Sequence, residues 1–300
     1  MSLIYNSMKK LFFSASVLFS ATICSAQKAD VAIGKATYEF IHVRDTTYRD
    51  KPYTETMALL LGRNASAYRS LTKQQQEEMM ANQIANQVKT AADPNRLNLT
   101  ITSPGAVSNE EYYQYINDKK LYTEEQIVNY YLVEEPLPTI KWAIQKDTMS
   151  FGALHAQKAT AHFKGRDYTA WFCPDLPFHN GPWKLNGLPG LILEASDSKK
   201  EVQFKFNGFE DISNLKQPIL PPPDDIKTTP QDLARLKEAR AKDPTGFSKA
   251  SHGSNSGARR GAKSFMGDID PNKIASINVV KSSSPNTRII NNPIELPEKK

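Results

Sequence analysis

The chain has 300 residues, with 38 Lys and Arg against 32 Asp and Glu, and a net charge of +6 at neutral pH. The excess of positive charge lies in residues 220–300, which hold 14 Lys and Arg against 9 Asp and Glu but almost no aromatic residues. Nucleic-acid binding needs basic residues interleaved with aromatic ones on a folded surface, so this composition excludes it.

The amino terminus is typical of a secretory signal peptide over residues 1–26. Lys9-Lys10 supplies the positive charge, residues 11–23 are apolar, and small residues precede the expected cleavage site near Ala26-Gln27. The apolar run is shorter than the ~20 residues that a transmembrane helix needs, and no other segment approaches that length. The sequence therefore predicts a periplasmic, outer-membrane-associated or secreted protein with no transmembrane segment.

Residues 27–217 are predicted to form a β-rich domain. Runs of β-branched and aromatic residues alternate with turn signals, which is the pattern of an antiparallel meander. Hairpin connections are expected at 117–119, at Lys164-Gly165 and at 197–200. The expected strands are 37–44, 55–61, 112–117, 127–134, 140–145, 154–163, 168–172, 191–196 and 201–207. The fold class is therefore mainly β (α+β): an antiparallel meander forming an open, half-barrel-like sheet with one covering helix.

Two helices are predicted. Thr72 opens a capping box, and Met80, Ile84 and Val88 follow at four-residue spacing, so this helix is expected to cover one side of the sheet. The second helix spans residues 230–241, with Thr229 as its N-cap and a proline at its first position. It has few apolar residues and is expected to dock weakly.

The composition changes after residue 217. Residues 218–285 are rich in Pro, Gly and Ser and have few apolar side chains to offset the entropy of ordering, which predicts a largely disordered insertion with one short helix. β-branched residues recur at 274–280 and 287–290. Residues 286–300 are therefore predicted to form a C-terminal strand that returns to the sheet.

The stretch 181–194 is the most informative in the chain. Its prolines fix φ and its glycines permit unusual backbone angles, so it reads as a rigid loop that leads an apolar strand into the core. It has no nucleophile or base, and its only titratable side chains are Lys184 and Glu194. The structural motif comprises Gly181, Pro182, Trp183, Gly187, Leu188, Pro189, Gly190, Leu191 and Ile192.

Residues 187–192 spell Gly-Leu-Pro-Gly-Leu-Ile, and the chain thereby resembles the GLPGLI family of exported Gram-negative envelope proteins. The resemblance extends over 158–163, 165–172, Leu176-Pro177, 181–184 and the closing 292–296. That family has no settled activity, so the resemblance implies an envelope protein of unknown biochemical function. By analogy of architecture, an open meander with a helix against it resembles the half-closed barrels of periplasmic lipoprotein carriers.

Candidate ligand-binding residues come from the aromatic-rich β region. Adjacent aromatic residues in a strand point to opposite faces, so both faces carry aromatics, and one of them forms either a filled core or a ligand-binding concavity. The sequence favours core filling for most of these aromatics. The candidates for ligand binding are Tyr130, Trp142, Arg166, Tyr168, Trp171 and Trp183.

No catalytic, metal or cofactor motif is recognisable. The five histidines, at positions 42, 155, 162, 179 and 252, form no metal-protease pair or Cys/His cluster, and no phosphate loop or serine elbow is present. Cys173, the one cysteine left after removal of the signal peptide, is interpreted as a small buried hydrophobe. An enzyme would require His42, His162, Arg166, Asp167 and Asp175 to converge.

Two further sites rest on short patterns. Asp45-Thr46-Thr47 and Asp147-Thr148-Met149 resemble O-glycosylation acceptors of exported bacterial proteins, which makes Thr46 and Thr148 the candidate threonines.

The leading hypothesis is a non-enzymatic exported binder or carrier of a hydrophobic ligand. One alternative is an accessory module of an outer-membrane transport system, with an envelope or outer-membrane protein as its partner. The other alternative is an uncharacterised hydrolase. No cofactor is predicted.

Overall fold

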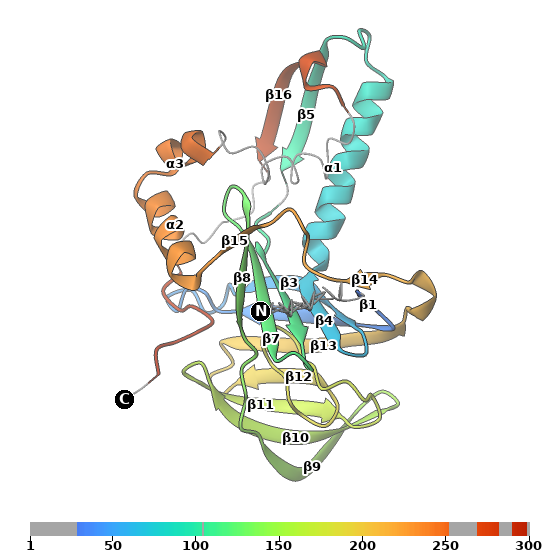
Figure 1. Ribbon diagram of the computed structural model, residues 1–300, viewed down its shortest axis with the longest axis vertical. Coiled ribbons are helices and arrows are strands. Elements are labelled where there is room, and N and C mark those ends of the chain that lie inside the picture. Colours follow the sequence, from blue (N-terminus) through green and yellow to red (C-terminus); the bar gives the residue numbers. More distant parts are fainter. Residues whose placement is uncertain (1–28, 104, 252–268, 282–289, 299–300) are drawn as a thin grey trace, which may run out of the picture.

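The computed structural model describes residues 29–103, 105–251, 269–281 and 290–298. Its main sheet contains twelve strands: β2 (Gly34–His42), β3 (Tyr53–Leu61), β4 (Ala65–Ser70), β6 (Glu110–Tyr115), β7 (Lys120–Gln126), β8 (Tyr130–Pro136), β9 (Ala143–Phe151), β10 (Leu154–Phe163), β11 (Arg166–Cys173), β12 (Leu191–Asp197), β13 (Val202–Asp211) and β15 (Ile226–Thr228). Their order is β15-β8-β7-β6-β4-β3-β2-β13-β12-β11-β10-β9, without closure into a barrel (Figure 1). Neighbours run antiparallel, except that β15 lies parallel to β8. The predicted class, a mainly β protein with an open antiparallel sheet, is confirmed.

Side-chain alternation explains why these segments pair. In β2, at the middle of the sheet, Ala36, Tyr38 and Phe40 are buried while the intervening residues are partly exposed. This is the period of two expected for a strand with one face on the core. Strand β9 lies at the edge of the sheet, beside β10, and most of its residues are exposed. The three predicted hairpin turns are confirmed, and each contains a lysine with positive φ: Lys119, Lys164 and Lys200.

Three strands of the main sheet were absent from the sequence expectations: β4, β7 and the three-residue β15. β4 has the sequence Ala-Ser-Ala-Tyr-Arg-Ser, which lacks strong strand formers, yet five of its six residues are buried between β3 and β6. β7 alternates weakly because it carries Lys120, Glu124 and Glu125. In β4 and β7, pairing with neighbours on each side decided the conformation, which local propensity does not report.

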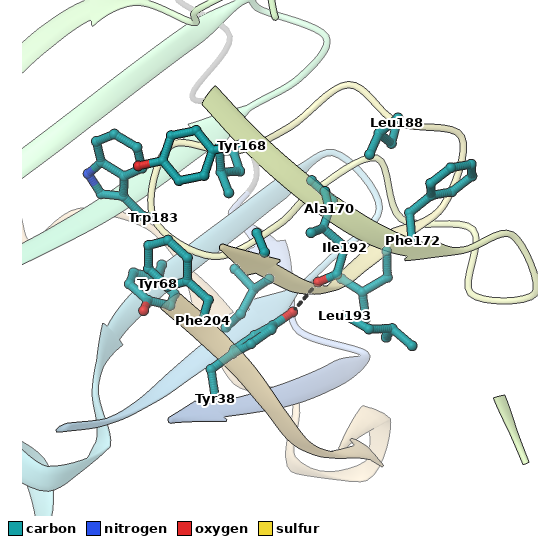
Figure 2. Packing of buried hydrophobic residues seen from close by; sticks show 14 of the residues in the cluster. Tyr38, Tyr68, Tyr168, Ala170, Phe172, Trp183, Leu188, Ile192, Leu193 and Phe204 are labelled. Carbon is teal, nitrogen blue, oxygen red and sulfur yellow. Dashed lines mark hydrogen bonds between the residues drawn. The ribbon is translucent and has the colours of Figure 1, made fainter. Parts of the chain in front are cut away.

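The main core lies on one face of the sheet and is rich in aromatic rings. Tyr38, Tyr168, Trp183 and Phe204 are among its largest fully buried side chains. Figure 2 shows Trp183 beside Tyr168 and the Tyr38 hydroxyl donating to the carbonyl oxygen of Ile192 at 2.7 Å. The core therefore joins the middle of the sheet to the 181–192 motif.

Helix α1 (Leu71–Lys89) occupies the expected residues but not the expected place. Its buried Ile84 packs against β5 (Leu97–Ser103), which pairs in parallel with β16 (Ile274–Lys281) in a separate two-stranded sheet. Figure 1 shows these three elements standing together, away from β9–β13. The expectation that α1 covers the main sheet was therefore wrong, because its apolar stripe meets β5 instead. Its N-cap is Ser70, whose hydroxyl accepts from the Lys73 amide, and not Thr72.

Within the segment 218–285, much of the part that the structure describes forms helices and strands. β14 (Pro218–Ile219) pairs with β1 (Asp30–Val31), and α2 (Pro230–Lys242) is followed by α3 (Pro244–Ser251). The predicted short helix corresponds to α2, with Thr229 as its cap, and Leu233 packs on β8 through Tyr131 and Val133. The short helices η1 (Ser213–Leu215) and η2 (Pro271–Lys273) complete the elements. Residues 252–268 and 282–289 of the predicted insertion, and the predicted signal peptide, lie outside the described residues.

The C-terminal segment 290–298 returns to the main sheet, but it forms no strand there. Asn291 and Asn292 donate their amides to the carbonyl oxygen of Arg44, and Leu296 donates to the carbonyl of Lys164. The expected strand within 286–300 is thus corrected to an irregular segment over these nine residues. Pro293 and Pro297 interrupt the run of backbone donors that a strand ladder needs.

Candidate functional site

A pocket of about 440 Å³ lies on the face of the main sheet that carries the core. It is called the aromatic pocket below. Its base is built by neighbouring strands β13, β2, β3, β4 and β6, which contribute Phe204, Phe40, Met57, Tyr68 and Tyr112. The cross-strand pairs Phe204–Phe40 and Tyr68–Tyr112 bring these side chains to one face. The volume falls within the range of about 300–1,000 Å³ typical of small-molecule sites.

Stacked rings make the base of the aromatic pocket rigid. The Phe40 and Phe204 rings stack with centroids 5.2 Å apart, and Trp183 also stacks on Phe204, with centroids 6.4 Å apart. Tyr68 meets Phe204 edge-on at 6.3 Å. Offset and edge-to-face rings of this kind hold each other in place, so the apolar floor is preformed.

One rim of the aromatic pocket is charged, with one lysine between two glutamates. Lys237, on α2, bridges Glu125 at 2.5 Å and Glu110 at 3.9 Å, and the Tyr112 hydroxyl donates to Glu110. Burial raises the pKa of Glu125, and Lys237 opposes that shift. Helix α2 thus closes this side of the pocket with paired charges.

Another wall is the C-terminal segment, whose Ile290, Pro293 and Ile294 line the pocket. Beside them on β2, His42 donates from Nε2 to the carbonyl oxygen of Asn292 at 2.8 Å. Burial, which outweighs this hydrogen bond, lowers the pKa of His42 to about 4. The imidazole is therefore uncharged at neutral pH.

A buried ionic network fixes that wall to the sheet, with Arg166 at its centre. The Arg166 guanidinium donates to Asp197 at 2.6 Å, to Glu201 at 3.3 Å and to the side chain of Asn292 at 2.7 Å. It also donates to the carbonyl oxygens of Pro293, at 2.7 Å, and Ile294, at 2.8 Å. The Arg166 and Asp197 side chains are each only 2% exposed. Although burial alone raises the pKa of Glu201, hydrogen bonds from Arg49 and Arg166 leave it lowered.

The structure separates the six predicted ligand-binding residues. Trp183 lines the aromatic pocket, and Tyr168 lies 6.4 Å from it, centroid to centroid, within the core. Arg166 is the centre of the buried network, and the Trp142 indole donates to the carbonyl of Asn186. Tyr130 lines a separate, polar pocket of about 270 Å³ beside the start of α1. Trp171 lines neither pocket, and ligand binding by any of the six stays a prediction.

The sequence reasoning missed the residues that form the pocket floor, chiefly Phe40, Met57, Tyr68 and Phe204. Strand alternation was available for Phe40, Met57 and Phe204, which lie in expected strands, but not for Tyr68 on β4. What the sequence did not reveal was that β13 pairs with β2, so that Phe204 lies opposite Phe40, 164 positions earlier in the chain. The β2–β3 and β3–β4 pairings then add Met57 and Tyr68 to the same floor.

Most residues of the 181–192 motif are packed into the core, and its role as a structural loop stays a prediction. Leu188, Leu191 and Ile192 are buried, whereas Gly187 and Pro189 are exposed at the surface. Gly190 has φ of 150°, and a Cβ there would lie 2.3 Å from the carbonyl oxygen of Cys173. The backbone approach at this glycine is therefore too close for any side chain.

The side chains proposed to converge in an enzyme fall into two groups. His162 and Asp167 pair across the β10–β11 hairpin at 2.6 Å, with Glu298 on the other imidazole nitrogen at 2.8 Å, and these carboxylates raise the pKa of His162. His42 and Arg166 instead meet through Asn292, on the pocket side. Asp175 is exposed in the turn after β11.

Three further predictions concern metal sites, membrane spans and modification. Within the described ranges, no group of three or more His, Cys, Asp or Glu side chains is placed to hold a metal ion. No helix in the part of the chain that the structure describes is long and apolar enough to cross a bilayer. Thr46 and Thr148 are both exposed, Thr46 beside Asn291 and Thr148 on the edge strand β9. Their O-glycosylation stays a prediction, and Cys173 is buried and free as expected.

The fold and the pocket define a class of open, mainly β protein with an aromatic pocket of small-molecule size. Residues 155–194, from β10 into β12, match a family described as "Protein of unknown function (Porph_ging)". The match includes Arg166, Tyr168, Trp171, Trp183 and the 187–192 hexapeptide. It supports the expectation of a family without established activity, while the GLPGLI name stays a resemblance.

Other comparisons add little. Nothing among curated proteins matches the chain. Two structures of PNGF-II, solved in the P21 and C2 space groups, resemble it with TM-scores of 0.46 and 0.43 and identities of 10% and 11%. They cover 68% and 67% of this chain, which spans 32% of the length of each PNGF-II chain.

Proposed function

We propose that this protein is an exported envelope protein that binds a hydrophobic small molecule in the aromatic pocket. The observation that carries the proposal is a pocket of about 440 Å³ lined by Phe40, Val107 and Ile294 and supported from beneath by the buried, stacked rings of Phe204 and Trp183. Burying apolar ligand surface against such a floor contributes about 25 cal/mol per Å². A floor that is already ordered adds little entropy cost on binding.

Two independent elements enclose the pocket. Helix α2 supplies Lys237 on one rim, and the C-terminal segment supplies Ile290, Pro293 and Ile294. Walls that rise above the sheet let a site cover more of a small ligand than a flat sheet face does. This arrangement favours binding over a purely structural sheet.

The experiment is a titration of the purified protein with the neutral fluorophore N-phenyl-1-naphthylamine. We expect saturable fluorescence enhancement, together with quenching of the Trp183 emission. The Val107→Trp variant should abolish both signals by filling the pocket, since Val107 lines it and is only partly buried. The matched control is Val279→Trp, at a valine that is 53% exposed on β16, outside the pocket.

Equal binding by wild type and Val107→Trp would refute the proposal, and so would no binding by wild type. Among the described residues we find no specific observation that favours the hydrolase or the transport accessory module over a binder. Both stay alternatives from the sequence.

A further inference from the structure

Arg44 differs from the other charged residues that line the aromatic pocket. It follows Val43, the residue after β2, and its backbone carbonyl oxygen accepts hydrogen bonds from the amides of Asn291 and Asn292. Its guanidinium carbon lies 3.3 Å from the centroid of the Tyr53 ring. Within the described residues, no carboxylate lies within 4 Å of this guanidinium, whereas Lys237 is paired with two glutamates. Arg44 thus carries a positive charge with no ion-pair partner among the described residues, and the carboxylate next to its stacking ring, that of Glu55, accepts a hydrogen bond from the Tyr53 hydroxyl at 2.6 Å.

The stacking on Tyr53 orients Arg44 without using its hydrogen-bonding edge. A guanidinium that lies over a ring contributes its face to the cation–π contact, so its N–H donors, which lie in its plane, stay free for an acceptor. The neighbouring His42 is neutral near pH 7, because burial lowers its pKa to about 4. The pocket therefore offers an apolar floor and one planar cation.

We propose that the ligand is a singly charged amphiphilic carboxylate, with its apolar part on the ring floor and its carboxylate on Arg44. This inference rests on the proposed function and specifies its ligand class. A guanidinium fork matches the two oxygens of a carboxylate. One uncompensated cation balances one negative charge, whereas a phosphate monoester carries about two at neutral pH. The second charge of such a ligand would face the rim, where the carboxylates of Glu110 and Glu125 share the single cation Lys237.

The test compares three ligands with the same twelve-carbon chain: dodecanoate, 1-dodecanol and dodecyl phosphate. Each displaces bound N-phenyl-1-naphthylamine from wild type at neutral pH, and micelle-free concentrations are used throughout. We expect dodecanoate to bind about ten- to hundred-fold more tightly than dodecanol, the range for hydrogen bonds to a charged group. Dodecyl phosphate should bind more weakly than dodecanoate.

Arg44→Gln should remove the preference for dodecanoate and leave dodecanol affinity within about two-fold, because the hydrogen bonds to a charged group are lost while the apolar floor is kept. Arg44→Lys keeps the charge without the planar fork and should retain part of the preference. The matched control is Arg63→Gln, at an exposed arginine outside the pocket, which should behave as wild type. Melting temperatures of all variants confirm folding.

The outcomes separate this inference from the proposed function. If the fluorophore and dodecanol bind but dodecanoate shows no preference, or the preference survives Arg44→Gln, the carboxylate inference is overturned and the hydrophobic site stands. Tighter binding of dodecyl phosphate than of dodecanoate also overturns it. If no probe binds wild type, both proposals fall.

Discussion

Replacing Arg166 with methionine should destabilise the protein by about 3–5 kcal/mol, the usual cost of removing one partner from a buried ion pair. Arg166 and Asp197 are each 2% exposed and Glu201 is 6% exposed, so neither carboxylate can be rehydrated without opening the structure. Arg49, at 2.7 Å from Glu201, can compensate one of the two charges. Asp197 keeps only the backbone amides of Glu201 and Val202 as donors.

The same substitution should loosen the C-terminal segment, because Arg166 makes three of its five hydrogen bonds to residues 292–294. Urea unfolding followed by tryptophan fluorescence measures the global loss. Amide hydrogen exchange at Asn291, Asn292 and Leu296 measures local release of the segment, and these amides should exchange faster than the global change predicts. The Arg166→Lys variant keeps the charge but has fewer donors, so it should lose less stability.

A loss below about 1 kcal/mol, or unchanged exchange at these three amides, would refute this account of the network. Arg63→Met serves as the control. Arg63 is exposed in the turn after β3, so its replacement should stay within about 0.5 kcal/mol of wild type.

Three further predictions follow from single residues. Gly190→Val should cost at least about 2–3 kcal/mol by urea unfolding, since its Cβ would lie 2.3 Å from the Cys173 carbonyl oxygen; Gly208→Ala, with no atom within 4 Å of the added carbon, should be near neutral. Trp183→Ala should cost about 3–5 kcal/mol, because Trp183 is only 2% exposed. His42→Gln should weaken the acid dependence of stability between pH 6.5 and about 4, measured by urea midpoints at about pH 7 and pH 4.5.

The sign of the His42 effect follows from linkage. The unfolded imidazole takes up its proton near pH 6.5, but the buried one resists protonation until the pKa of about 4. Stability is therefore fully present above pH 6.5 and declines as the pH falls, by up to about 3 kcal/mol. Charged neighbours Arg44, Arg166 and Asp197 also act on this group. An unchanged pH slope in His42→Gln, or a Gly190→Val protein as stable as wild type, would contradict these assignments.

Several elements were predictable because the information is local. The run 154–163 alternates apolar and polar residues and is bounded by turn residues, and β10 has the same limits. Lys164-Gly165 forms the expected two-residue turn. Both residues have positive φ, a backbone conformation that glycine adopts without steric cost. Residues 97–103 alternate just as clearly, Leu-Asn-Leu-Thr-Ile-Thr-Ser, so β5 could have been found by the same reasoning.

The candidate site was harder to predict because it depends on pairing between distant segments. Trp183 was selected for its place in a distinctive loop, and it does line the aromatic pocket. Phe40 and Phe204 were not selected, because only the β2–β13 pairing places them 5.2 Å apart. Arg166 was selected as a ligand-binding candidate, but its environment is set by Asn292, 126 positions along the chain.

By itself the sequence determined the β-rich class, the three hairpin turns and the helix that carries Met80, Ile84 and Val88 on one face. These depend on backbone preferences and on alternation within short segments, which act before any long-range contact forms. The tertiary structure alone decided that α1 packs on β5 and that the C-terminal segment forms one wall of the aromatic pocket. It also decided that Arg44 lines that pocket without an ion-pair partner among the described residues. Each of these depends on contacts between segments that are distant in the sequence. The burial of apolar area drives such contacts, and it does not depend on how far apart the segments lie along the chain.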